Sequence, residues 1–204
     1  MNPVVVTCVD AHAWVAKKGG DPTAFEGGQV SLNPIPHIKR EPFGMVVLPL
    51  LSLLTSGAMI GWASAPFNPA WQRAYPRRAA LMALAGPMAN FLIVIIAGVL
   101  LRIGLSSGAF SGSEMMLGVG TFLDICFRLN LLLGIFNLLP FPPFDGYGVL
   151  GFFTGGSGAE RWENLRIRLS QFSFIGLLVG WQAIQYVYPS VLAVAQGVLV
   201  AGLR

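Results

Sequence analysis

The 204-residue sequence has few charged residues. They make up 11% of the chain, whereas hydrophobic residues make up 54%, and the mean hydropathy is +0.67. A soluble domain carries about 25% charged residues, so this composition is typical of a polytopic membrane protein. We therefore expect a single membrane-embedded domain, residues 1–204, whose surroundings are a lipid bilayer.

Other features that are scarce or missing exclude further classes. The two cysteines, Cys8 and Cys126, both lie in apolar segments and imply no disulfide framework. No basic segment precedes the first apolar run, so we expect no cleavable signal peptide. The 13 lysine and arginine residues lie in loops and form no basic face, so we expect no nucleic-acid partner. No internal repeat is visible, which argues against a transporter.

The apolar segments predict an all-α polytopic protein with about four transmembrane helices. The first helix runs from Asn2-Pro3 to Lys17-Lys18; with about 15 residues it covers about 22 Å, less than the ~30 Å hydrocarbon core. The other three spans are residues 79–101, about 115–139 and 169–203. Within residues 79–101, Ala85-Gly86-Pro87 predicts a local break. In the last span, Gly176 and Gly180 offer a small-residue packing face.

Three shorter segments complete the predicted fold. Gln29–Leu32, inside a Gly- and Pro-rich stretch, alternates like a short β-strand. The uncharged residues 43–62 are interrupted by Pro49, and we expect this segment to re-enter on the side from which it came. Residues 159–171 predict an interfacial helix. Its apolar stripe is Trp162, Leu165 and Leu169, opposite Arg161, Glu163, Arg166 and Arg168.

The loop charges favour this re-entrant topology. If residues 43–62 return to their own side, loops 17–42, 63–78 and 140–171 share one face and carry four, three and three basic residues. The loop of residues 103–114 carries none. Because basic loops stay cytoplasmic, we expect a multi-pass protein of the cell (plasma) membrane with its basic face in the cytoplasm.

The sequence FNLLPFPPFDGYG, residues 136–148, is the strongest candidate for a functional segment. Its prolines cannot continue a regular helix, so Asn137 and Asp145 must lie on broken backbone that lines a cavity in the protein. An ionisable group at membrane depth is a functional candidate. The alternative is a proline-kinked helix end, with Asp145 as the N-cap of the next element.

Cys8 and His12 lie four residues apart in the first apolar helix, so their side chains project from one helix face. With Asp145 they offer sulfur, nitrogen and oxygen ligands, a set that suits zinc with an open fourth position. The alternative is a buried histidine hydrogen-bonded to a neighbour, beside a small apolar cysteine. The spacing by itself favours that alternative.

Five motifs together resemble the site-2 protease family of intramembrane zinc metalloproteases. In chain order they are AHAWVAKKGGDPTA (Ala11–Ala24), LNPIPHI, GWASAPFNP with the following Pro76-Arg77-Arg78, AGPMAN and FNLLPFPPFDG. The likeness covers most of residues 11–150, and the pairing of AGPxxN with NLLPxPPxDG is specific. Residues 159–204 then supply the interfacial helix and the last transmembrane helix.

The resemblance implies a zinc site and a substrate class. In the family, H-E-x-x-H supplies two zinc-binding histidines and a glutamate base, and the Asp of the DG motif is the third ligand. Carried over by position, His12 is the second histidine, Asp145 is the DG ligand, and Asn90 and Asn137 are polar groups for the substrate. The substrate is a transmembrane protein segment cut inside the bilayer. Gln29–Leu32 would correspond to the family's β segment, which presents substrate by strand addition.

The chain departs from the family at the two residues that should read H-E, because it has Cys8-Val9. Cysteine is itself a zinc ligand, whereas valine cannot accept a proton, so the general base is missing. Asp10 is no substitute: it lies about 200° around the helix from Cys8 and about 160° from His12. We therefore expect a metallopeptidase framework without efficient proteolysis.

Three readings of this departure stay open. The first is a non-catalytic relative that binds transmembrane segments without cutting them. The second is an active protease whose recorded start carries a frameshift or a divergent 5′ end, which would account for Cys8, for Val9 and for the short first helix together. The third, a small transporter, has the least support in the sequence.

Overall fold

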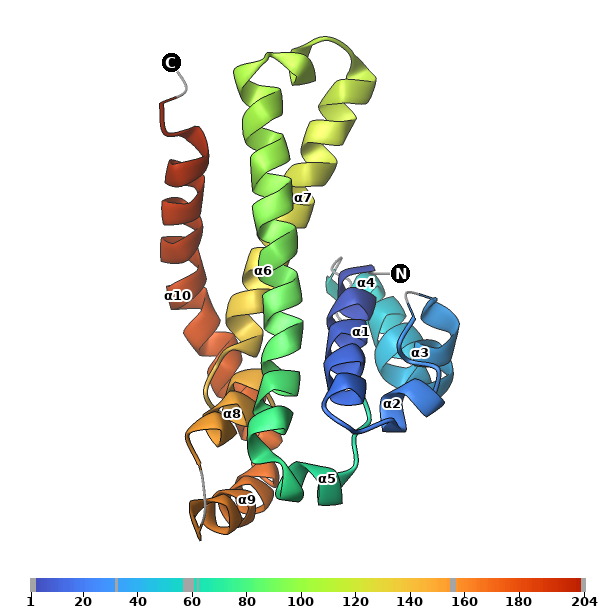
Figure 1. Ribbon diagram of the computed structural model, residues 1–204. Coiled ribbons are helices and arrows are strands. Elements are labelled where there is room, and N and C mark those ends of the chain that lie inside the picture. The colour runs from blue at the N-terminus through green and yellow to red at the C-terminus, as the bar shows by residue number, and fades with distance from the viewer. Residues whose placement is uncertain (1–2, 32, 57–60, 62, 155–156, 203–204) are drawn as a thin grey trace.

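The computed structural model describes residues 3–31, 33–56, 61, 63–154 and 157–202. The described residues form helices and no strand, which confirms the all-α prediction (Figure 1). Gln29, Val30 and Ser31 lie in a loop with bends, and Leu32 is outside the described residues, so the predicted β-like piece is not confirmed.

Three of the described helices are long and apolar enough to cross a bilayer. They are α6 (Pro76–Ser106), α7 (Glu114–Asn137) and α10 (Ser173–Val200). Helix α6 is central: α7 returns along it after the short η2 (Ala109–Ser111), and α10 stands on its other side (Figure 1). Helices α6 and α7 form a core of Ala97, Leu101, Phe127 and Leu131, and α10 packs against it with partly buried residues such as Tyr188 and Leu192. The three spans match the later three of the expected four.

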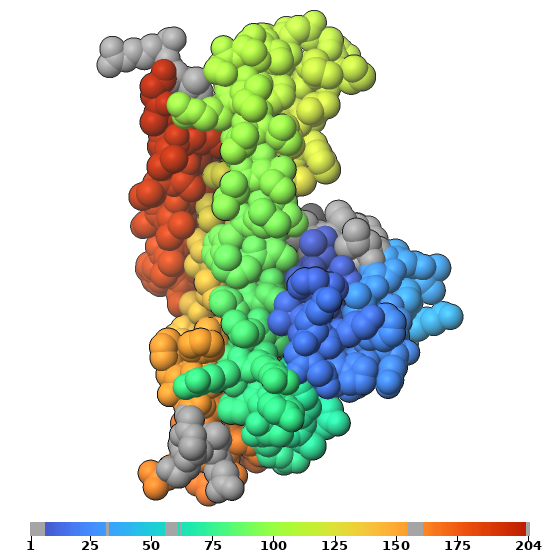
Figure 2. Space-filling model, viewed as in Figure 1, coloured from blue at the N-terminus to red at the C-terminus, as the bar shows by residue number. Residues whose placement is uncertain are grey.

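The first part of the chain forms a block of shorter helices against α6, on the side away from α10 (Figure 2). It contains α1 (Pro3–Lys18), α2 (Thr23–Glu26), α3 (Pro34–Arg40), η1 (Phe43–Val47) and α4 (Leu48–Ser56). Helix α1 has 16 residues, about 24 Å, which is too short to span by itself. The apolar helix Phe43–Thr55 is also too short to span, and its re-entry stays a prediction.

The end of α1 is fixed to the corner where α5 (Pro69–Ala74) meets α6. The Gly19 carbonyl accepts hydrogen bonds from Trp71 Nε1 at 3.0 Å and Arg78 Nη1 at 3.1 Å. Asp21 is 1% exposed, and its Oδ2 accepts from the Asn68 backbone N–H at 2.7 Å. Asn68 in turn caps α5 through its side chain. The GGDPT and FNP motifs therefore set the position of α1 along α6.

Helix α6 continues without a break through Ala85-Gly86-Pro87, so the local break expected there is wrong. Pro87 removes one backbone donor from the helix, but α6 is packed by α1 and α7 on both sides of this point. Neighbouring helices hold a proline-containing helix together at membrane depth. The backbone around Gly86 is therefore a regular, rigid surface.

The predicted broken segment is confirmed after α7. The chain turns at residues 138–144, with a cis peptide bond between Pro142 and Pro143, and then forms α8 (Asp145–Val149) and η3 (Leu150–Phe153). Helix α10 packs on this turn through its glycines, as predicted. A Cβ at Gly176 would overlap the Pro142 carbonyl oxygen, and a Cβ at Gly180 would lie 2.5 Å from the Phe144 ring.

Helix α9 (Ser157–Ser170) is present at the expected place, but its faces differ from the prediction. Glu163 is 8% exposed and faces the protein, whereas Leu165 is 46% exposed. The sequence pattern was misleading because Arg166 neutralises Glu163 through two hydrogen bonds of 2.9 and 3.0 Å. A paired carboxylate can be buried where a lone one cannot.

Candidate metal centre

Helices α1 and α8 bring three potential metal ligands together. Cys8 Sγ lies 3.8 Å from His12 Nε2, which lies 3.1 Å from Asp145 Oδ2. All three ligand atoms lie within 4.8 Å of one another. His12 is 8% exposed, and Cys8 is half-buried. His12 and Asp145 are 133 positions apart in the chain, so the packing of α1 and α8 on α6 creates this cluster.

The backbone of α6 fixes the tautomer of His12. The Nδ1 atom lies 2.7 Å from the Met82 carbonyl oxygen; since a carbonyl only accepts, Nδ1 carries the proton and donates it. In a neutral ring, Nε2 is then an acceptor that faces the Asp145 carboxylate. Two acceptors at this distance need a cation between them, either a proton or a metal ion.

Gly86 allows α6 to approach this cluster. A Cβ at this position would lie 2.2 Å from His12 Nε2 and 2.6 Å from Cys8 Sγ. Both distances are far below ordinary van der Waals contact, about 3.5 Å. Only glycine fits here without displacing the ligands. The motif Ala85-Gly86-Pro87 predicted a helix break and gave no indication of this role, although a glycine inside an apolar helix was the available signal.

The arrangement fits zinc. Zinc binds histidine nitrogen, cysteine sulfur and carboxylate oxygen at about 2.0–2.3 Å, which places tetrahedral neighbours about 3.3–3.6 Å apart. Two of the three separations, 3.1 and 3.8 Å, lie just outside this range on either side, and all three ligand atoms lie within 4.8 Å of one another. Three protein ligands with one position left over is the pattern of catalytic zinc sites, whereas structural sites use four.

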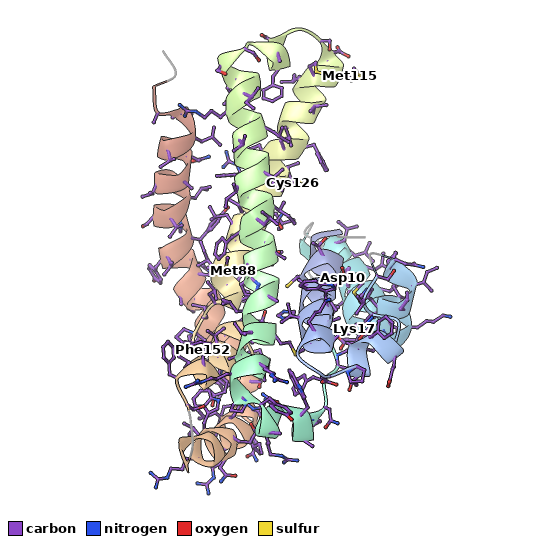
Figure 3. All side chains as sticks on the ribbon, viewed as in Figure 1. Asp10, Lys17, Met88, Met115, Cys126 and Phe152 are labelled. Atoms are coloured by element: carbon purple, nitrogen blue, oxygen red, sulfur yellow. The ribbon has the colours of Figure 1, made fainter. Side chains whose placement is uncertain are left out.

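The two residues between the α1 ligands do not complete a catalytic set. Val9 is 2% exposed and lies in the protein core. Asp10 faces the other way: its carboxylate accepts from the Ser31 backbone and interacts with His37 in α3. Figure 3 labels Asp10 on α1. Among the described residues, no further histidine, cysteine or acidic side chain joins the cluster of Cys8, His12 and Asp145.

The two predicted polar residues lie near the cluster but not in it. Asn90 lies one helical turn after Gly86 on the same side of α6, is 0% exposed, and has no hydrogen-bond partner for Oδ1 or Nδ2 among the described residues. Asn137 is the last residue of α7, where the turn to Asp145 begins. The structure records no hydrogen bond between either asparagine and the three ligand residues in the described part of the chain.

An aromatic pair covers the other side of α8. Tyr147 and Trp162 have ring centroids 4.9 Å apart. Tyr147 is 7% exposed, and its Oη has no hydrogen-bond partner among the described residues. Burial raises the pKa of this hydroxyl group, so Tyr147 stays neutral. Helix α9 therefore contacts the short helix that carries Asp145.

Comparison with known proteins shows the family of the chain. The family model of peptidase family M50 matches residues 11–177. YwhC of Bacillus subtilis is 37% identical over 141 residues, which are 69% of this chain and 60% of the relative. Rip2 of Mycolicibacterium smegmatis is 29% identical over 68% of this chain and 49% of the relative. Both relatives are named "Putative zinc metalloprotease".

A third relative, MJ0611 of Methanocaldococcus jannaschii, is also named "Putative zinc metalloprotease". It is 36% identical over 37% of this chain and 35% of the relative. The chain spans 60% or less of the length of these curated relatives. No solved structure matches the chain.

Proposed function

We propose that the chain, which belongs to peptidase family M50, the site-2 protease family, binds one zinc ion and engages transmembrane protein segments within the bilayer. Cys8, His12 and Asp145 hold the ion. Hydrolysis of peptide bonds in those segments is the inherited reaction, and Val9 makes this chain a very slow catalyst of it. In this proposal the protein is a multi-pass protein of the plasma membrane.

The observation that carries this proposal is the meeting of three zinc-type ligands from α1 and α8 around one point. An apolar helix that merely tolerated a histidine and a cysteine would not need a carboxylate from 133 positions away. Nor would it need a glycine on a third helix that leaves room for both side chains. A buried, hydrogen-bonded histidine, the alternative left open by the sequence, accounts for the Met82 contact but not for the cluster.

The residues in and around the cluster have different roles in this proposal. Cys8, His12 and Asp145 would hold a zinc ion, which would supply a Lewis acid for the scissile carbonyl and a water whose pKa is lowered to about 7. His12 is kept in the ligand tautomer by the Met82 carbonyl. Nδ2 and Oδ1 of Asn90 have no hydrogen-bond partner among the described residues, and such a donor and acceptor complement a peptide group in an extended segment. The His12 side chain is 10% exposed, whereas that of Asp145 is 29% exposed, so the cluster is partly open on the Asp145 side.

Val9 limits the chemistry. General acid–base catalysis contributes typically 10²–10⁴-fold to a rate, and an alkyl side chain supplies none of it. Val9 lies about 60° from His12 around α1, so a longer acidic side chain at this position points to the metal side of the helix. A single substitution is therefore the sharpest probe of the reaction.

The test compares the purified chain with Val9→Glu and with the double variant Cys8→His/Val9→Glu in lipid nanodiscs. We expect about one zinc per chain in all three, and cleavage of a labelled transmembrane peptide that rises at least ~100-fold in the variants with glutamate. Asp145→Ala should remove the zinc. A wild-type chain without zinc, or an Asp145→Ala chain that keeps it, would refute the metal site.

A non-catalytic role is the second candidate, and the burial of Val9 in the core favours it. In that case Cys8→His/Val9→Glu binds zinc and crosslinks to the transmembrane peptide as the wild type does, but cuts nothing. The crosslink separates this outcome from loss of substrate binding. A carrier function predicts solute flux in liposomes and no crosslink.

A further inference from the structure

Helix α9 has one face on the protein and another face that nothing in the described chain covers. Trp162 and Glu163 lie against the start of α6 and against η3. Arg161, Leu165 and Arg168 are exposed. These three residues follow an i, i+4, i+7 spacing, which places them on a single stripe of the helix. The outer stripe is therefore one apolar side chain between two guanidinium groups.

The charges of this stripe are available. Arg166 is the other arginine of α9, and it is occupied by the carboxylate of Glu163. Arg161 and Arg168 make no ion pair or hydrogen bond with any residue whose side chain the structure describes. Two unpaired arginines that flank a leucine match the surface of an anionic bilayer, where the leucine enters the headgroup layer and the guanidinium groups bind phosphates.

The position of α9 in the fold agrees with this partner. Helix α9 ends three residues before α10 begins, and it lies across the end of the bundle where α6 starts (Figure 1). Helices α6 and α10 are both candidate spans, so a bilayer surface passes this end of the molecule. Arg77, in the first turn of α6, is exposed at the same end. This is the face that the loop charges place in the cytoplasm, where anionic lipids are found.

The inner face of α9 leads directly to the metal centre. The Trp162 ring contacts the Tyr147 ring, and Tyr147 lies two residues after Asp145 in the five-residue helix α8. Helix α8 has little freedom on its other sides. A Cβ at Gly146 would overlap the Leu138 carbonyl oxygen, and a Cβ at Gly148 would lie 2.8 Å from Ala83 in α6. The contact between Trp162 and Tyr147 therefore connects α9 to the tightly packed helix that carries Asp145.

We propose that the stripe of Arg161, Leu165 and Arg168 binds anionic phospholipid headgroups, and that this contact holds Asp145 in its ligand position through Trp162 and Tyr147. The inference rests on the proposed function, because it treats Cys8, His12 and Asp145 as a metal site. It adds a condition: the chain binds its metal more tightly in an anionic bilayer than in a zwitterionic one.

The experiment places the chain in nanodiscs of phosphatidylcholine, with or without phosphatidylglycerol. Two quantities are measured: backbone hydrogen exchange of α9, and zinc affinity by competition with a chromophoric chelator. Each arginine near an anionic surface contributes about fivefold to association. For two arginines we expect exchange in α9 to slow by about tenfold or more, with zinc affinity at least about twofold higher. Inorganic phosphate added to phosphatidylcholine discs should reproduce neither change.

Two variants separate lipid binding from transmission. Arg161→Gln/Arg168→Gln should lose both responses to phosphatidylglycerol, whereas Trp162→Ala should lose only the response of zinc affinity. The matched control is Lys39→Gln/Arg40→Gln, which removes two exposed charges from α3 and should respond as the wild type does.

The possible failures are distinct. If α9 exchanges equally fast in both lipids, the headgroup contact is refuted, and an acidic protein partner becomes the better assignment of the stripe. If α9 responds but zinc affinity does not, the transmission through Trp162 and Tyr147 is refuted. If the chain binds zinc in neither lipid, the proposed function itself is refuted. If Lys39→Gln/Arg40→Gln loses both responses to phosphatidylglycerol to the same extent, overall charge explains them, and a specific role of the stripe is refuted.

Discussion

Substitution of Gly86 by alanine tests the geometry of the metal centre most directly. The added Cβ would lie 2.2 Å from His12 Nε2 and 2.6 Å from Cys8 Sγ. Ordinary contact needs about 3.5 Å, so α1 or the ligand side chains must retreat by about 1 Å. Metal–ligand distances tolerate only about 0.2 Å. Loss of an outer-shell contact by itself costs about 10–100-fold in metal affinity, and we expect a loss of at least this size.

Stability should change less than metal affinity. Overpacking a core costs about 1–3 kcal/mol, while replacing glycine by alanine in a helix returns about 0.5–1 kcal/mol. We expect Gly86→Ala to lower the free energy of unfolding by about 1–2 kcal/mol and to fold normally. Zinc stoichiometry, chelator competition and thermal unfolding in the same detergent measure the two effects separately.

Gly118→Ala is the matched control. Gly118 lies in α7, and a Cβ there would meet no atom within 4 Å. This variant should keep its zinc and gain about 0.5–1 kcal/mol of stability. The reasoning fails if Gly86→Ala binds zinc as tightly as Gly118→Ala does, because the ligands would then not occupy the space that the structure assigns to them.

Three further results are expected. Asp145→Asn keeps the size of the side chain but weakens a zinc ligand, so zinc content should fall sharply while thermal stability stays within about 1 kcal/mol; unchanged zinc content contradicts the ligand role. Asp21→Ala leaves the Asn68 backbone donor unpaired beside a buried site, and should lower the unfolding free energy by about 2–3 kcal/mol in denaturant titration. Arg102→Gln removes three hydrogen bonds to carbonyl groups at the C-terminus of α10; we expect faster hydrogen exchange there, about 1–2 kcal/mol less stability and no change in zinc binding.

Composition and local pattern determined much of this protein. Scarce charge and long apolar runs predicted a helical membrane protein, and three of the expected spans are present. The broken backbone before Asp145 was predictable because proline cannot continue a helix. The order of the motifs identified the family, which the match over residues 11–177 confirms.

Local pattern failed where pairing or packing overrides residue type. Glu163 lies on the inner face of α9 because Arg166 neutralises it, and Pro87 stays inside a continuous helix because α1 and α7 pack on α6. Sequence periodicity contains neither fact, since both depend on a partner. The predicted strand at Gln29–Leu32 is not confirmed, because Gln29, Val30 and Ser31 lie in a loop and Leu32 is outside the described residues.

The geometry of the candidate metal centre needed the tertiary structure. The sequence placed Cys8 and His12 on one face of a helix and singled out Asp145. Their spacing by itself favoured a buried histidine, whereas the family resemblance implied a zinc site with His12 and Asp145 as ligands. Only the fold brings atoms 133 positions apart to 3.1 Å, and only the approach of α6 shows that Gly86 leaves the space for them. The spacing of residues along a helix determines the side of the helix from which their side chains project. A metal site also requires the right distances between side chains on different helices, and the packing of α1, α6 and α8 sets these distances.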